Sequence, residues 1–232
     1  MINQTLLKII GSREDISDYL FHFTKGTSAI DSLDSIIQNR AIRDINGSGV
    51  ICFTEVPILM VNKMFELFEF YSEPMYARNG IGIRKEYLYN LGARPVIYGT
   101  DEEKCLLHDD IKWRFEKYIP NIRDFSWLRE WRIKACKVCL EDKLDFFIIT
   151  NTSEELTAFT FDSENIGNIE FDGDVEDGGE FHGYAYTSIP RNNRGISFEG
   201  IRSLNLLSKH EVHKLLSEQS FEDTEKMSLG GF

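Results

Sequence analysis

The stretch from Ser126 to Lys134 most limits what this chain can fold into, because it has the pattern of a strand yet carries charges between large aromatic side chains. Alternation places Trp127 and Trp131 on one face, and we expect these tryptophans to anchor the strand in the core. Glu130 and Arg132 fall on the opposite face. Charges in such a strand are unfavourable unless they are solvated or paired, so the strand is expected to border a cleft or an ion-pair network.

A second unusual strand covers residues 19–24 and contains a histidine. His22 and Thr24 project to one side, while Phe21 and Phe23 take the other side and point to the core. This polar pair fits either a solvent face or the wall of a pocket. Its position relative to Glu130 decides between the two interpretations. If both side chains line one concave pocket with an aromatic ring between them, the enzyme interpretation gains strongly, whereas it fails if they face opposite sides of the sheet.

The bulk properties describe one globular domain with an acidic surface. The chain has 232 residues, of which 42% are hydrophobic, and a formal net charge of -12. This charge argues against broad binding to nucleic acid, except as a modified substrate, and against anionic membranes. No apolar run is long enough to span a membrane, and the N-terminus lacks the features of a signal peptide. We therefore expect a cytoplasmic protein with reduced thiols.

Cys136 and Cys139 have the CxxC spacing of redox and zinc sites. They directly follow the strand of Glu130, and positions three apart on a strand point to opposite faces, which is wrong for joint ligation. No second CxxC exists. We expect no metal site.

The order of elements predicts an α+β fold with a split mixed β-sheet and flanking helices. A single domain is expected over residues 1–207, followed by a terminal helix and flexible tail over 208–232. Residues 162–183 are acidic and glycine-rich and predict an exposed loop, with a ragged hairpin near its middle. The strands are expected at 19–24, 50–55, 80–84, 95–98, 126–134 and 145–150, and the helices at 28–40, 58–71, 85–91 and 101–124.

Glu130 has two interpretations. It forms a structural ion pair with Arg132, or it is a carboxylate at a cleft that stabilises a developing positive charge. Tyr71 and Tyr76 flank a loop from which an aromatic ring can stack on a ligand. The sequence contains no GxSxG, no GxGxxG after a strand and no Walker A motif, so a serine hydrolase, a Rossmann site and a P-loop are not expected.

Several short motifs occur in the order typical of the AbiGi-like abortive-infection family of bacteria. The resemblance covers residues 19–135 and implies a bacterial protein of phage defence or of a toxin–antitoxin pair. The motifs are Phe21-His22-Phe23-Thr24, Cys52-Phe53-Thr54-Glu55-Val56-Pro57, Tyr76 with Gly80-Ile81-Gly82-Ile83-Arg84-Lys85, Pro95-Val96-Ile97-Tyr98, and Trp127 with Glu130-Trp131-Arg132.

The chain also resembles, at the level of fold, the DarT-like ADP-ribosyltransferases. Their first core strand carries a histidine that holds the NAD ribose, and a late strand carries the catalytic glutamate. The resemblance implies that NAD is a substrate, that Glu130 and His22 are the catalytic pair, and that His22 and Thr24 lie on the adenine-side ribose. It further implies that Thr54 or Tyr71 fills the middle motif, with Tyr71 stacked on nicotinamide, and that Arg132 or Arg43 meets the pyrophosphate. Leu128 stands where enzymes that modify protein arginine have Gln or Glu.

An alternative function is a non-catalytic antitoxin or interaction protein. In that case the acidic surface around residues 172–180 engages a basic partner, encoded nearby, or mimics nucleic acid.

Overall fold

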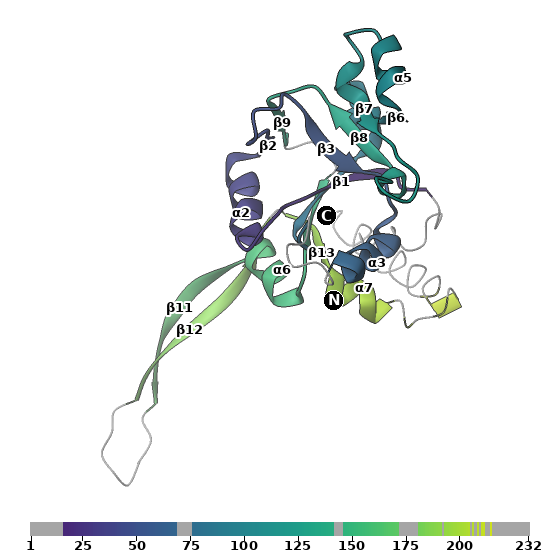
Figure 1. Cartoon of the computed structure of the whole chain (residues 1–232). Coiled ribbons are helices and arrows are strands. Elements are labelled where there is room, and N and C mark those ends of the chain that lie inside the picture. The colour runs from purple at the N-terminus through teal and green to yellow at the C-terminus, as the bar shows by residue number, and fades with distance from the viewer. Residues whose placement is uncertain are drawn as a thin grey trace, which may run out of the picture.

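The computed structural model describes residues 16–68, 76–141, 146–171, 181–191 and 193–204, together with the single positions 206, 208, 210, 211 and 214. It confirms a mixed α+β fold with a large sheet and flanking helices (Figure 1). The large sheet has the strand order β13-β10-β4-β1-β3-β8-β5. These strands are β1 (Tyr19–Phe23), β3 (Ile51–Thr54), β4 (Gly80–Arg84), β5 (Arg94–Pro95), β8 (Glu130–Ile133), β10 (Phe146–Thr150) and β13 (Gly195–Ser197).

The middle of the sheet is held by antiparallel pairing of β1 with β4, in which five consecutive residues of each strand are in register. Two glycines of β4 allow close packing against both neighbouring strands: a Cβ added to Gly80 would lie 2.4 Å from the His22 carbonyl oxygen of β1, and one added to Gly82 would lie 2.6 Å from the ring of Phe147 in β10. The pairing of β10 with β13 is parallel, so the sheet is mixed.

Helices cover both faces of the sheet. Phe21 and Phe23 pack with α3 (Ile58–Phe68) and α7 (Phe198–Leu204) on one face. On the other face, Leu33 of α2 (Ala29–Asn39) and Phe159 of α6 (Ser153–Thr160) pack against β10. Trp131, Ile81 and neighbouring apolar side chains form a further cluster that reaches α4 (Lys85–Asn90). The predicted helices over 28–40 and 85–91 are confirmed, and the one over 58–71 is confirmed as far as Phe68.

Three small sheets complete the fold. They pair β2 (Ala41–Arg43) with β9 (Lys137–Cys139), β6 (Ile97–Gly99) with β7 (Phe115–Lys117), and β11 (Phe161–Phe171) with β12 (Phe181–Pro190). The β11–β12 ribbon projects from the body of the molecule (Figure 1). The hairpin expected around residues 168–172 is present up to Phe171 and is longer than predicted, so the prediction of an exposed loop over 162–183 is wrong for its two flanks, which form an antiparallel ladder. Residues 172–180 lie outside the described residues, as does most of the predicted terminal helix.

The prediction of a helix over 101–124 is also wrong. Helix α5 covers only Asp101–Leu106, and the segment continues through a 3-10 turn (Lys112–Arg114) into β7. Leu106, an apolar residue of this segment, is 85% exposed. The apolar residues of the segment have helical spacing, but the helix ends at Leu107, which has extended backbone angles. Further along, Phe115 lies in a strand and pairs with Ile97.

The Glu130 strand is shorter than predicted. Residues Ser126–Leu128 form a 3-10 turn, and Arg129 follows in the left-handed region with a φ of 44°. Because Trp127 lies in this turn, the strand alternation does not include it. Its prediction as a core anchor is wrong, since Trp127 is 42% exposed. Trp131 is buried as predicted. Within the described part of the chain, no helix has the length and apolar character needed to cross a membrane.

Candidate functional site

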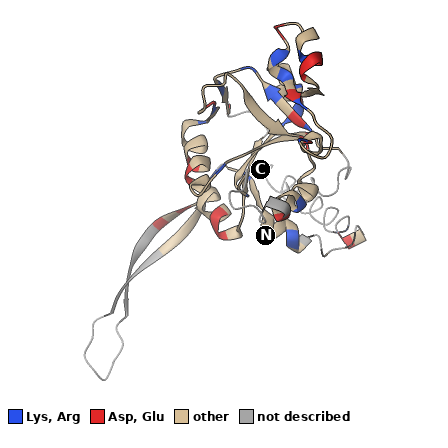
Figure 2. Cartoon of the chain, viewed as in Figure 1, with Lys and Arg blue, Asp and Glu red and all other residues tan. Residues whose placement is uncertain are grey.

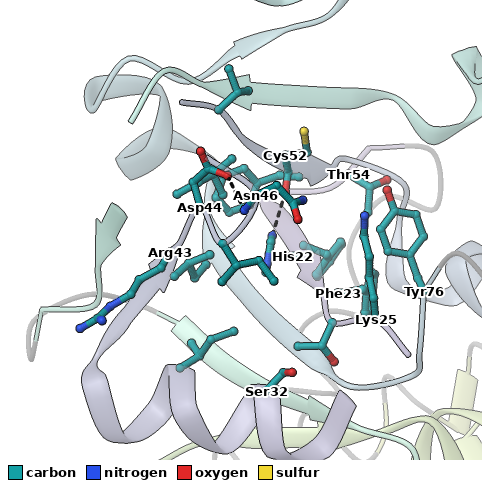
Figure 3. A pocket seen from close by; sticks show the side chains of 18 of the residues that line it. His22, Phe23, Lys25, Ser32, Arg43, Asp44, Asn46, Cys52, Thr54 and Tyr76 are labelled. Carbon is teal, nitrogen blue, oxygen red and sulfur yellow. Dashed lines mark hydrogen bonds between the residues drawn. The ribbon is translucent and has the colours of Figure 1, made fainter. Parts of the chain in front are cut away.

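A cavity of about 540 Å³ lies where β1 and β3 part. The two strands share a single register pair, Phe21 with Thr54. Beyond this pair the imidazole of His22, rather than a backbone N–H, contacts the Cys52 carbonyl across the gap (Figure 3). The cavity is lined by α2, by the turn from β2 to β3, and by Tyr76, Leu128 and Glu130. Its volume is in the range of natural sites for small molecules and cofactors.

His22 lines the cavity and is half-buried. Its Nδ1 atom lies 2.9 Å from the Cys52 carbonyl oxygen, which accepts a hydrogen bond only if Nδ1 carries the proton. Burial lowers the pKa of His22, and the Cys52 contact opposes this effect only in part. The ring is thus the neutral tautomer with Nε2 as a hydrogen-bond acceptor.

Glu130 also lines the cavity, and it is held by Arg132. Its Oε1 atom accepts a hydrogen bond of 2.8 Å from Nε of Arg132. The exposed fractions of the two side chains are 14% and 15%. Burial alone would lower the pKa of Arg132, but hydrogen bonds to Glu130 and Glu116 raise it. The structural ion pair expected from the sequence is present, and it coexists with a place for Glu130 in the cavity wall.

Thr54 lies opposite Glu130 in the β3–β8 ladder, and Cys52 lies opposite Arg132. The Thr54 hydroxyl donates to the Leu128 carbonyl at 2.5 Å and accepts from the amide of Val56, so it fixes the turn before Glu130. Burial, followed by the nearby Glu130 carboxylate, raises the pKa of Cys52 to about 12. The thiol is therefore protonated at neutral pH and is a poor nucleophile.

Tyr76 contributes the aromatic ring of the site. Its pKa is raised to about 12, mainly by burial and then by the charge of Glu130. The ring lies beside Thr54 and Lys25 (Figure 3), with the Lys25 ammonium 5.5 Å from the ring centroid. Tyr71, the predicted stacking residue, lies outside the described residues. The sequence places both tyrosines at the edges of a loop from which either ring can stack on a ligand, and the resemblance implies this role for Tyr71.

The β-ladders place His22 and Glu130 on opposite faces of the sheet. Phe21 is in register with Thr54, and Thr54 with Glu130, so these three side chains share a face. His22 takes the other face, where its ring lies 5.7 Å from that of Phe53. Both residues nevertheless line one cavity, whose wall includes residues from both faces of β1 and β3. The shared cavity thus meets the condition that favours the enzyme interpretation, whereas the opposite faces meet the condition that speaks against it.

Three other predicted site residues are placed as follows. Thr24 is buried at the cavity edge, and its hydroxyl donates to the Asn79 carbonyl at 2.9 Å. Arg43 lines the cavity, but its guanidinium points away from His22 (Figure 3) and donates to Asn39 at 3.4 Å. Arg132 lies behind Glu130 and is engaged by two carboxylates. Lys25 also lines the cavity, and its only signal in the sequence is its position directly after Thr24.

Cys136 and Cys139 are exposed free thiols at β9. Among the described residues, no group of three or more His, Cys, Asp or Glu side chains is arranged to hold a metal ion.

Comparison of the chain with known protein families, with curated proteins and with solved structures gives no match.

Proposed function

We propose that this chain is an ADP-ribosyltransferase-like enzyme that binds NAD and breaks the bond between nicotinamide and ribose. The observation that carries the proposal is the cavity at the split between β1 and β3, to which one strand contributes His22 and the ladder of the other contributes Glu130. A cavity of this volume suits a dinucleotide that bends through the gap. The position of the two residues on opposite faces means that they meet different parts of such a ligand.

Glu130 is suited to stabilise the reacting ribose. When the C1′–N bond breaks, its electron pair leaves with nicotinamide and the ribose acquires oxocarbenium character. A carboxylate fixed in a partly buried wall lowers the energy of that positive charge without having to reorganise. The acceptor, either water or a hydroxyl or amine of a target, then bonds to C1′ and releases a proton.

His22, Tyr76 and Lys25 are suited to bind the rest of the molecule. The Nε2 atom of His22 accepts a hydrogen bond from a ribose hydroxyl. The ring of Tyr76, close to Glu130, offers a stacking surface for nicotinamide. The ammonium of Lys25 supplies a positive charge for the pyrophosphate. Transfer of ADP-ribose in phage defence or in a toxin–antitoxin pair is the biological role that the sequence resemblance supports.

The experiment is to measure nicotinamide release and the melting temperature of the full chain with and without millimolar NAD. We expect NAD to raise the melting temperature and the wild-type chain to release nicotinamide. A melting curve that NAD leaves unchanged, together with no release of nicotinamide, would refute the proposal.

A second candidate function is binding of a basic partner through the β11–β12 ribbon. This ribbon stands out from the body (Figure 1), and the described side chains of Phe161–Glu164 and of residues 186–189 are exposed. Residues 161–190 contain no Lys or Arg. In this function the cavity is not needed, so Glu130→Gln would leave partner binding unchanged while shortening of the ribbon would abolish it.

A further inference from the structure

Two carboxylates share the guanidinium of Arg132. Its Nε donates to Oε1 of Glu130 at 2.8 Å, and its Nη2 donates to Oε2 of Glu116 at 2.7 Å. Glu130 belongs to β8 and lines the cavity, whereas Glu116 belongs to β7 and does not appear in the cavity wall. The side chains of all three residues are at most 16% exposed. Residues of both charges lie at this end of the molecule (Figure 2).

Backbone carbonyl groups also hold the guanidinium of Arg132. Its Nη1 donates to the Phe115 carbonyl at 2.7 Å and to that of Trp113 at 3.4 Å. Three nitrogen atoms of one planar group are thus engaged, Nε by Glu130 and both terminal nitrogens by the segment 113–116, and the plane has a single orientation that satisfies them all.

The contact between Arg132 and Glu130 involves only one nitrogen, Nε, and one carboxylate oxygen. Arginine and carboxylate groups favour two parallel hydrogen bonds when nothing competes. Glu116 is the competitor here, because it holds Nη2, which a two-pronged contact with Glu130 would require. Burial would raise the pKa of Glu116, but hydrogen bonds from Arg123 and Arg132 keep it below its ordinary value, so the competing group is ionised.

We propose that Glu116 is a positioning residue: acting through Arg132, it keeps Glu130 directed into the cavity. The catalytic consequence of this arrangement rests on the function proposed above, whereas the arrangement itself rests on the contacts of Arg132 alone. Without the charge of Glu116, the guanidinium turns to Glu130 and takes both of its oxygens. The Glu130 carboxylate is then drawn away from the bound ribose and its charge is neutralised locally.

Arg123 provides a matched control. It also contacts Glu116, with Nη2 2.8 Å from Oε1, but its side chain is 50% exposed. It approaches the carboxylate from solvent and has no contact with Arg132 among the interactions described. Removal of Arg123 changes the surroundings of Glu116 and leaves the bond from Glu116 to Arg132 in place.

The experiment compares Glu116→Gln and Arg123→Gln with the wild-type chain in nicotinamide release. Glutamine keeps the size of the side chain and removes its charge, so its neutral oxygen binds Nη2 more weakly than the Glu130 carboxylate does. We expect kcat of Glu116→Gln to fall at least about tenfold while KM for NAD stays within about threefold, and Arg123→Gln to keep both constants. An unchanged kcat in Glu116→Gln, or an equal loss in Arg123→Gln, would overturn the proposal.

A second measurement does not depend on turnover. We expect the melting-temperature shifts of Glu116→Gln and Glu130→Gln to be non-additive, with the double variant differing by at least about 2 °C from the sum. Additive shifts would show that Glu116 does not act on Glu130 and would overturn the proposal. If the wild-type chain releases no nicotinamide, the proposed function fails, and this coupling alone decides whether Glu116 positions Glu130.

Discussion

The Nδ1 atom of His22 lies 2.9 Å from the carbonyl oxygen of Cys52, and this contact joins β1 to β3 at the point where the two strands part. The carbonyl oxygen requires a proton on Nδ1. A proton on Nε2 as well would place a positive charge in a largely buried position. Burial accordingly lowers the pKa of His22. The neutral imidazole therefore belongs to the native structure.

Stability is predicted to fall when the pH drops below about 6.5, the ordinary pKa of histidine. In that range the unfolded chain takes up a proton at His22 while the folded chain does not, because its pKa is lowered. The stability is fully present above pH 6.5 and is lost at up to about 1.4 kcal/mol per pH unit below it. Urea unfolding at pH 7.0 and 5.8 measures the effect, and His22→Asn, which keeps a donor for Cys52, is the control. Equal pH dependence in both chains would show that His22 is not responsible.

Arg132→Gln is predicted to destabilise the fold by about 3 kcal/mol, because it leaves Glu116 and Glu130 without their shared cation. Arg123→Gln removes a cation from the same carboxylate at the surface and should cost below about 1 kcal/mol. Denaturant unfolding of the two variants makes the comparison. Similar losses would mean that solvent screens both ion pairs alike.

Thr152→Ala and Thr100→Ala test two capping boxes of the same design. In each, the threonine hydroxyl accepts a hydrogen bond from the backbone three residues on, at Glu155 and Glu103 respectively. Loss of such a cap costs about 1 kcal/mol. Helix α6 buries Phe159, whereas α5 buries no residue, so only Thr152→Ala should lower the global free energy of unfolding. Hydrogen exchange should show that Thr100→Ala loosens α5 locally. A global loss in Thr100→Ala would contradict this difference.

Gly82→Ala is predicted to destabilise the sheet by about 2 kcal/mol, because the new methyl group would lie 2.6 Å from the ring of Phe147. Gly82→Ala combined with Phe147→Leu should recover part of the loss by making room. Thermal unfolding of the single and double variants tests this. If Phe147→Leu adds its own full cost instead, the ring is not the obstacle.

The sequence was sufficient to predict the α+β class and most elements of the large sheet. Strong local signals account for this success, such as the polar and aromatic alternation in residues 19–23. The helix predicted over 101–124 failed because pairing of β6 with β7 overrides a helical spacing. The sequence does not predict the length of the β11–β12 ladder, because acidic residues and glycines interrupt its aromatic and β-branched positions.

The candidate site could be predicted only in part. His22 and Glu130 were identified because polar residues stand out in aromatic strands. Their placement on opposite faces follows from the Phe21–Thr54 register, which no local pattern in the sequence specifies. The roles of Glu116 and Lys25 depend likewise on contacts between distant segments.

The central claim is that Glu130 acts on a ligand bound in the cavity between β1 and β3. The most direct measurement is nicotinamide release from NAD by the wild-type chain and by Glu130→Gln, with the NAD-induced rise in melting temperature recorded for both. We predict that Glu130→Gln lowers the rate at least about 100-fold and still shows the rise in melting temperature. Equal rates in the two chains, or no release and no stabilisation by NAD in the wild-type chain, would contradict the claim.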